Sequence, residues 1–216
     1  RRVAFVRHNN IYIEDIAGGH ITALTSDGSQ TLINGTFDWV YEEEWSLRDG
    51  FRWSPDGQSI AYWQLDSDGV RDFHLINNTD GLYSRIIPIP YPKVGERNSA
   101  CRVGVVSAAG GETRWMNVPG DPRDHYIARM DWARDSDELI LQHVNRLQNT
   151  NTVMLANART GDIREILTER DEAWVDIEDE LHWLDEGRRF AWLSERAGWR
   201  QLYVASRSGA EPRLIT

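Results

Sequence analysis

Three consecutive carboxylates lie among aromatic rings in the stretch FDWVYEEEWS, residues 37–46. The acids are Glu42, Glu43 and Glu44, and the rings nearest to them belong to Trp39, Tyr41 and Trp45. Neighbouring carboxylates repel one another, and a cation that lies between them removes the repulsion. A run of like charges is, however, most often a solvated loop. Composition alone favours the loop and leaves a cation site as the second interpretation.

The other residues that could do chemistry are scattered. The six histidines show neither an HxH nor an HExxH spacing, so we predict no metal site and no cofactor. They are His8, His20, His74, His125, His143 and His182. No G-x-S-x-G nucleophile elbow is present, and serines such as Ser46, Ser54 and Ser194 lie in predicted turns and strands. We therefore predict no catalytic residue in this chain.

A second acidic stretch, WVDIEDELHW at residues 174–183, also lies between tryptophans. Its acids are Asp176, Glu178, Asp179 and Glu180. Calcium binds carboxylate oxygens, but this spacing matches no known calcium loop. A polar connection between two sheets is the interpretation that we favour.

The overall composition excludes some classes of function. The 216 residues carry a net charge of −10, which argues against nucleic acid as the main partner because phosphates require a basic surface. No apolar run reaches the roughly 18–20 residues that span a membrane. One cysteine excludes an internal disulfide framework and leaves a cytoplasmic or a bacterial periplasmic location open. The chain opens directly on a predicted strand, so we expect a fragment of a longer protein.

Two sequence elements repeat along the chain. The first is a tryptophan followed by a polar turn and an apolar strand, and it occurs at residues 51–64, 130–144 and 181–195. The second is an alternating strand, a glycine-bearing turn and another short strand, at residues 9–25, 101–118, 151–168 and 200–216. Glycine-bearing turns between alternating strands predict β-hairpins.

These repeats predict an all-β fold, a partial β-propeller of four-stranded antiparallel blades. About three complete blades and part of another fit in the chain, and a β-sandwich is the alternative. The distance from Trp53 to Trp132 is 79 residues and that from Trp132 to Trp183 is 51, so the longer interval must hold an insertion. No segment of 10–12 residues shows a clear helical period, which predicts little helix.

Several motifs resemble the N-terminal β-propeller of the dipeptidyl peptidase IV family of serine peptidases. They are DWVYEEE (38–44), WSPDGQSIAYWQ (53–64), IPIPYPKVGERN (87–98), GDPRDHYIARMDW (120–132) and HVNRLQN (143–149). The resemblance implies that residues 1–216 are a fragment of an eight-bladed propeller. It also implies a C-terminal α/β-hydrolase domain, absent from these residues, that supplies the catalytic serine. The parent protein is then expected to remove dipeptides from free peptide N-termini, whereas the fragment alone is expected to be inactive.

The resemblance assigns roles within the acidic motif. Glu43 and Glu44 correspond to the acids that hold the substrate's terminal ammonium, while Glu42 is left a structural role. The rings of Trp39, Tyr41 and Trp45 are expected to exclude water and fix the backbone. Consecutive strand residues point to opposite faces, so both acids can meet one cation only on a helical or irregular segment. We predict that residues 41–46 form a short helical insertion that projects inwards from the propeller.

Residues 102–125 correspond to a family segment that contributes to a homodimer interface. Trp115 and Met116 are the candidate anchors, and an ordinary edge hairpin is an equal alternative. The leading partners are therefore a peptide with a free N-terminus, the hydrolase domain and a second copy of the chain.

Two other functions stay open. A non-catalytic propeller that serves as a scaffold for protein partners is the main alternative, and it includes family members that lack the active serine. A TolB-like interaction propeller shares the WSPDG turn, but the acidic triplet among aromatic residues argues against it.

Overall fold

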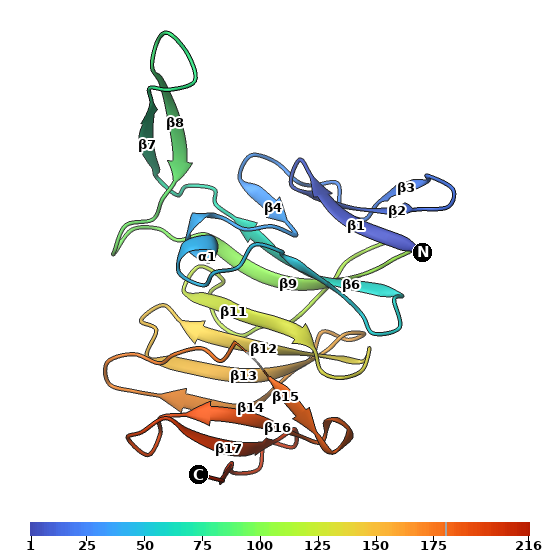
Figure 1. Ribbon diagram of the computed structural model, residues 1–216, viewed down its shortest axis with the longest axis vertical. Helices are drawn as coiled ribbons and strands as arrows, with labels where there is room; N and C mark the ends of the chain where they lie inside the picture. The colour runs from blue at the N-terminus through green and yellow to red at the C-terminus, as the bar shows by residue number, and fades with distance from the viewer. Residues whose placement is uncertain (180) are drawn as a thin grey trace. The chain divides into compact units, whose positions relative to one another are not determined.

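A computed structural model describes residues 1–179 and 181–216, which form mainly antiparallel β-sheet (Figure 1). Two compact units divide the chain, one of residues 1–51 and 62–101 and the other of residues 52–61 and 102–216. The strands are β1 (Arg2–Arg7), β2 (Asn10–Asp15), β3 (Ile21–Ala23), β4 (Leu32–Asn34), β5 (Phe51–Trp53), β6 (Ser59–Asp66), β7 (Asp72–Asn77), β8 (Arg85–Pro90), β9 (Ala100–Ser107), β10 (Arg114–Trp115), β11 (His125–Trp132), β12 (Glu138–Asn145), β13 (Thr150–Asn157), β14 (Ile163–Arg170), β15 (His182–Leu184), β16 (Arg189–Ser194), β17 (Gln201–Ser206) and β18 (Arg213–Leu214). Among the described residues, the helical segments are α1 (Trp39–Glu43) and the 3-10 turn η1 (Asp185–Gly187). No helix in this part of the chain is long and apolar enough to cross a membrane.

The sheets follow the predicted repeats. Their strand orders are β1-β2-β3, β10-β9-β6-β4 with β5 also paired to β6, β11-β12-β13-β14 and β15-β16-β17-β18. Each Trp-turn-strand element supplies a hairpin such as β11–β12, and each glycine-bearing element supplies a hairpin such as β13–β14. The prediction of a partial propeller, with about three complete blades and part of another, is therefore confirmed.

The predicted turns form for local chemical reasons. In the turn between β5 and β6, the Ser54 hydroxyl donates to the Asp56 carboxylate at 2.6 Å, and the Gln58 amide donates to the same carboxylate at 2.9 Å. These hydrogen bonds lower the pKa of Asp56. Between β13 and β14, Gly161 has a φ of +83°, and a Cβ there would lie 2.4 Å from the carbonyl oxygen of Trp115. This close approach of backbone requires glycine.

Within the second unit, the β11–β14 sheet packs against the β15–β18 sheet (Figure 1). Their shared core comprises Ala133, Ile140, Val153, Leu155, Ile166, Leu167, Phe190, Trp192 and Ala205. The Glu169 carboxylate lies buried beside this core and accepts hydrogen bonds from Trp192 Nε1 and Ser194 Oγ, both at 2.9 Å. Pairing of this kind offsets the cost of burying a charge.

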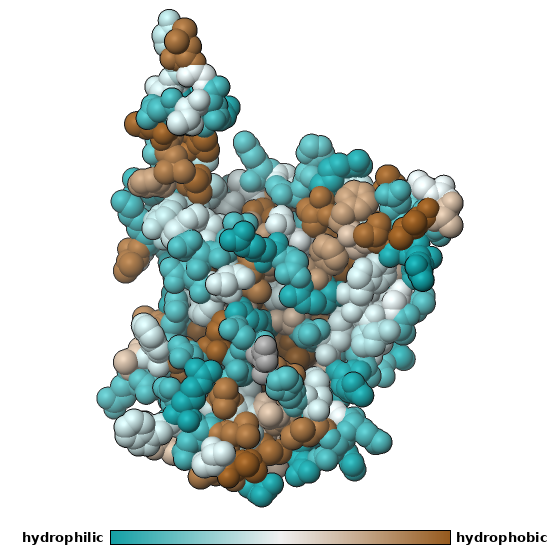
Figure 2. All heavy atoms as spheres, in the orientation of Figure 1, coloured by the Kyte–Doolittle hydropathy of each residue, from teal (hydrophilic) through white to brown (hydrophobic). Residues whose placement is uncertain are grey.

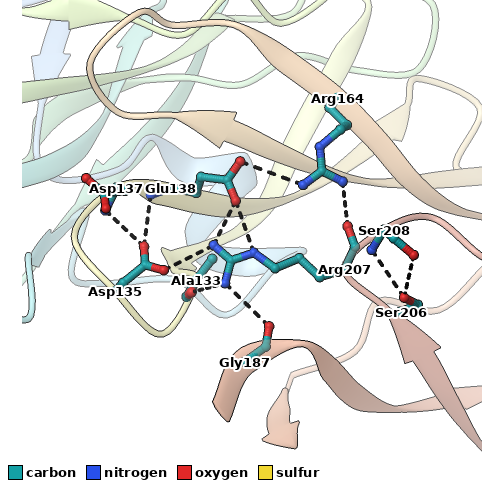
Figure 3. Close-up of polar contacts among 9 residues, drawn as sticks. All are labelled: Ala133, Asp135, Asp137, Glu138, Arg164, Gly187, Ser206, Arg207 and Ser208. Carbon is teal, nitrogen blue, oxygen red and sulfur yellow. Dashed lines mark hydrogen bonds and ion pairs between the residues drawn. The ribbon is translucent and has the colours of Figure 1, made fainter. Parts of the chain in front are cut away.

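Arg207 joins the same two sheets on their polar side (Figure 3). From the turn after β17, its guanidinium donates to the Glu138 carboxylate at 2.7 and 3.0 Å and to the carbonyl oxygen of Ala133 at 3.0 Å. It also contacts the Asp135 carboxylate at 3.3 Å. Arg207 and Glu138 are both largely shielded from water. Their network is therefore expected to contribute more to the stability of the fold than the exposed ion pair of Arg159 and Asp137.

The predicted insertion is the β7–β8 hairpin of the first unit, which pairs Asp72 with Pro90 and Asn77 with Arg85. Figure 2 shows apolar atoms gathered along it. Its exposed apolar side chains are Phe73, Leu75, Ile76, Leu82, Tyr83 and Ile86. The hairpin is anchored at its base, where the Phe73 ring packs against Tyr91 with their centroids 5.7 Å apart.

Two histidines meet between neighbouring strands of the second unit. His125 of β11 is buried, and its ring centroid lies 4.6 Å from that of His143 on β12. Burial lowers the pKa of His143 to about 4, and repulsion from His125 acts in the same direction. The fold therefore holds the His143 imidazole neutral.

We expect the free energy of unfolding to fall as the pH is lowered from about 6.5 towards about 4. The pKa of His143 is about 4 in the folded protein, against 6.5 for an ordinary histidine. The unfolded chain therefore binds a proton in this window that the folded chain does not, and the stabilisation present above pH 6.5 is lost on acidification. His143→Phe should remove this part of the pH dependence, measured by urea unfolding of both proteins at about pH 7 and about pH 4.5. An equal loss of stability in the two proteins would contradict the expectation.

Candidate functional site

The acidic motif forms a short helix because Asp38 caps it. Asp38 is extended, with φ −86° and ψ 179°, and its side chain accepts a hydrogen bond from the Tyr41 amide at 3.1 Å. Aspartate is among the preferred N-cap residues because it satisfies an amide that the first turn leaves unpaired. The helix α1 begins at Trp39, and Glu44 continues its backbone conformation with φ −77° and ψ −36°.

Aromatic residues enclose the base of α1. The Phe37 ring stacks on Tyr41 with centroids 5.6 Å apart, and it meets Trp63 edge-on at 5.2 Å. Phe37, Tyr41 and Trp45 are buried. The partly exposed Trp39 packs against Tyr91, just after the β7–β8 hairpin, with centroids 4.1 Å apart. The backbone that carries the acids is thus packed from several sides.

Glu42, Glu43 and Glu44 are exposed. In an α-helical conformation, consecutive side chains are separated by about 100° around the axis, rather than pointing to opposite faces as on a strand. In the described part of the chain, neither the Glu43 nor the Glu44 carboxylate makes a hydrogen bond or an ion pair with another residue. The two carboxylates are therefore free to accept hydrogen bonds from a ligand.

The predicted helical segment is confirmed, but its boundaries differ. We predicted residues 41–46, whereas the helix spans Trp39–Glu43, because the cap lies at Asp38. The helical turn ends before Ser46, which has a φ of +55°. The chain reverses there, and the Leu47 amide donates to the Tyr41 carbonyl at 3.1 Å.

Two residues of this site were missed by sequence reasoning. Besides capping α1, the Asp38 carboxylate accepts a hydrogen bond of 2.6 Å from the hydroxyl of Ser99. Both residues are buried, and this burial raises the pKa of Asp38. The cap could have been recognised from an aspartate three residues before Tyr41. Ser99 carries no such signal, because it lies 61 residues further along the chain.

The second acidic stretch makes internal contacts. Asp179 pairs with Arg129, and the carbonyl of Glu178 accepts a hydrogen bond of 2.5 Å from the Gln142 side chain. The Glu178 carboxylate lies 3.5 Å from Arg200. Residues 1–179 and 181–216 contain no cluster of acidic, histidine or cysteine side chains that could hold a metal ion. Glu180, which was part of the predicted acidic group, lies outside the described residues.

The candidate dimer segment, residues 102–125, is largely integrated into the fold. Met116 is only 4% exposed, so the prediction that it anchors an interface is wrong. Trp115 is partly exposed, and the Arg102 guanidinium lies 3.6 Å from its ring centroid.

Comparison with known proteins settles the family. A family model described as the dipeptidyl peptidase IV N-terminal region matches residues 1–216. The chain belongs to this family. The dipeptidyl peptidase IV resemblance that we read from the DWVYEEE and PYPK motifs is therefore confirmed.

Individual members of the dipeptidyl peptidase IV family show the same relationship. The probable dipeptidyl peptidase 4 of Emericella nidulans is 29% identical over 234 residues, which cover 99% of this chain and 30% of that protein. The inactive dipeptidyl peptidase 10 of Mus musculus is 28% identical over 185 residues, which cover 83% of this chain and 23% of that protein.

A solved structure of a related protein has the same fold. The crystal structure of Porphyromonas gingivalis dipeptidyl peptidase 4 superposes with a TM-score of 0.92 at 32% identity, covering 100% of this chain and 31% of the other. The chain thus spans less than a third of the length of these proteins.

Proposed function

We propose that residues 1–216 form part of the N-terminal propeller of a serine-type dipeptidyl peptidase. In this proposal the propeller filters peptide substrates, and Glu43 and Glu44 bind the α-ammonium of the substrate. The catalytic residues belong to a C-terminal α/β-hydrolase domain of the same protein. Membership of the dipeptidyl peptidase IV N-terminal family supports this assignment.

The observation that carries the proposal is that two neighbouring carboxylates are exposed and lack a partner in the described part of the chain. Glu43 and Glu44 are exposed on a packed and capped helix, and neither is paired within the described residues. A peptide ammonium has three donors and needs acceptors, and charge-assisted hydrogen bonds to carboxylates are among the strongest available. Because the backbone of α1 is already ordered, binding does not have to order it.

Anchoring the ammonium determines where the substrate is cut. When one end of an extended peptide is held, the distance from that end to the catalytic serine selects a single peptide bond. Positioning of this kind supplies several kcal/mol of barrier reduction, up to roughly 7–11 kcal/mol in the best-oriented systems. The proposed product is therefore a dipeptide released from a free N-terminus.

The proposal is tested on the full-length protein with a peptide that has either a free or an acetylated N-terminus. Acetylation removes the positive charge and leaves the rest of the peptide unchanged. We expect release of the N-terminal dipeptide from the free peptide, with kcat/KM at least about a hundredfold lower for the acetylated one, since two charge-assisted contacts are lost. Equal cleavage of both peptides would overturn the proposed role of the acids.

A scaffold function is the second candidate, and one observation favours it. The relative named inactive dipeptidyl peptidase 10 matches 83% of this chain. The protein sequence after Thr216 discriminates between the candidates. A nucleophile elbow of the G-x-S-x-G type supports the peptidase, and a replaced serine supports the scaffold.

The proposed assembly includes a homodimer formed through residues 102–125. With Met116 buried, the contact in this segment would involve the partly exposed Trp115 and the exposed turn at Gly111 and Glu112.

A further inference from the structure

The helix that carries the acids is too short to be stable without contacts to the rest of the protein. α1 has five residues, and isolated helices shorter than about 12–15 residues are marginal in water. The direction in which Glu43 and Glu44 point must therefore be determined by contacts between α1 and the rest of its unit.

Those contacts hold α1 at both ends. At its end, the side chains of Trp45 and Leu47, which follow the helix, are buried. At its start, the single carboxylate of Asp38 accepts from the Tyr41 amide and from the Ser99 hydroxyl. The Asp38–Ser99 bond links the helix to the segment before β9, remote in sequence.

The Asp38–Ser99 bond is well protected. Asp38 is 8% exposed and Ser99 is 2% exposed. Their 2.6 Å separation is typical of a charge-assisted hydrogen bond between a hydroxyl and a carboxylate. Water cannot readily replace either partner, so loss of one leaves the other buried without its partner.

We infer that Asp38 is a positioning residue for the ammonium site, acting through Ser99 and the first turn of α1 to orient Glu43 and Glu44. The inference rests on the proposed function. Asp38 contacts no substrate in this account. Its removal releases the start of α1, and misplacement of the acids by about 1 Å is sufficient to cost up to roughly a hundredfold in rate.

The variants separate positioning from general stability. Asp38→Ala removes both hydrogen bonds, whereas Asp38→Asn keeps an acceptor for the Tyr41 amide and a polar partner for Ser99. Ser99→Ala removes only the link between the segments. The matched control is Thr25→Val, which deletes another buried hydroxyl of the same unit, bonded to Asn10 at 3.0 Å.

The readout is the ratio of kcat/KM for the free peptide to that for its acetylated form, measured on the full-length protein. Partial unfolding lowers both rates by the same factor and leaves the ratio unchanged. Displacement of the acids lowers only the rate on the free peptide. We expect the ratio to fall about tenfold in Asp38→Ala and about threefold in Ser99→Ala. It should stay within about twofold of the original in Asp38→Asn and Thr25→Val.

The positioning role of Asp38 and the ammonium-binding role of Glu43 and Glu44 can be overturned separately. An unchanged ratio in Asp38→Ala, together with a collapsed ratio in Glu43→Gln, would overturn the positioning role and leave the proposed function standing. An unchanged ratio in Glu43→Gln and Glu44→Gln would overturn both. A ratio that fell equally in Asp38→Ala and Thr25→Val would reduce Asp38 to an ordinary contributor to stability.

Discussion

Replacement of Glu43 or Glu44 by alanine is expected to lower kcat/KM of the full-length protein on a free N-terminal peptide by at least about tenfold. Each substitution removes one charge-assisted contact to the ammonium, which costs roughly 1.5–3 kcal/mol in the transition state. The free energy of unfolding should change little, because both side chains are exposed and unpaired within the described residues. Steady-state kinetics, with circular dichroism as the check on folding, measures both effects.

Glu42→Gln is the control for the change in charge. Glu42 is exposed on the same helix, and no contact with the ammonium is assigned to it. Its kcat/KM should stay within about threefold of the original value, since the remaining effect is that of a nearby solvated charge. Normal kinetics in both alanine variants would defeat the assignment of the ammonium site.

The second large effect concerns stability. Phe190→Ala is expected to lower the free energy of unfolding by about 3–5 kcal/mol. The Phe190 ring is fully buried in the core between two sheets and meets both Trp183 and Trp192 edge-on. Its loss leaves a cavity that these rigid rings cannot readily fill. Urea unfolding followed by tryptophan fluorescence measures the change.

The matched control lies on the same strand. Leu193 is 38% exposed, and Leu193→Ala should cost no more than about 1 kcal/mol. If the two variants lost similar stability, the core between these sheets would not be the principal contribution to the stability of this unit.

Much of the fold could be predicted because its signals are local. Alternating strands and glycine-bearing turns identified hairpins such as β13–β14, and the long interval between Trp53 and Trp132 located the β7–β8 insertion. Each signal depends on a few neighbouring residues, and the antiparallel partner follows directly in the sequence. The hairpins were therefore found at nearly their observed boundaries.

Contacts between distant segments could not be predicted in the same way. Ser99 meets Asp38 across 61 residues, and Arg207 meets Glu138 across 69. The positions of Ser99 and Arg207 in the sequence do not indicate which residues they contact in the fold. The start of α1 differs from the predicted one for a related reason, since it depends on the Asp38 cap, which the neighbouring aromatic residues do not indicate.

Describing the candidate site required both local sequence motifs and the structure. Composition favoured a solvated loop for Glu42–Glu44, and only the wider motif indicated a shared role for two of the acids. The structure adds that these acids lie on a helical turn with a packed base. Within the described residues, neither acid forms an ion pair with a basic side chain.

The central claim is that Glu43 and Glu44 together recognise the positive charge of a peptide N-terminus. It is tested most directly by the Glu43→Gln/Glu44→Gln double variant of the full-length protein, through the ratio of kcat/KM for free and acetylated peptides. The account predicts that this ratio falls to within about threefold of unity, because two neutral amides gain little from the ammonium. A double variant that still preferred the free peptide by the original factor would show that the charge is recognised elsewhere.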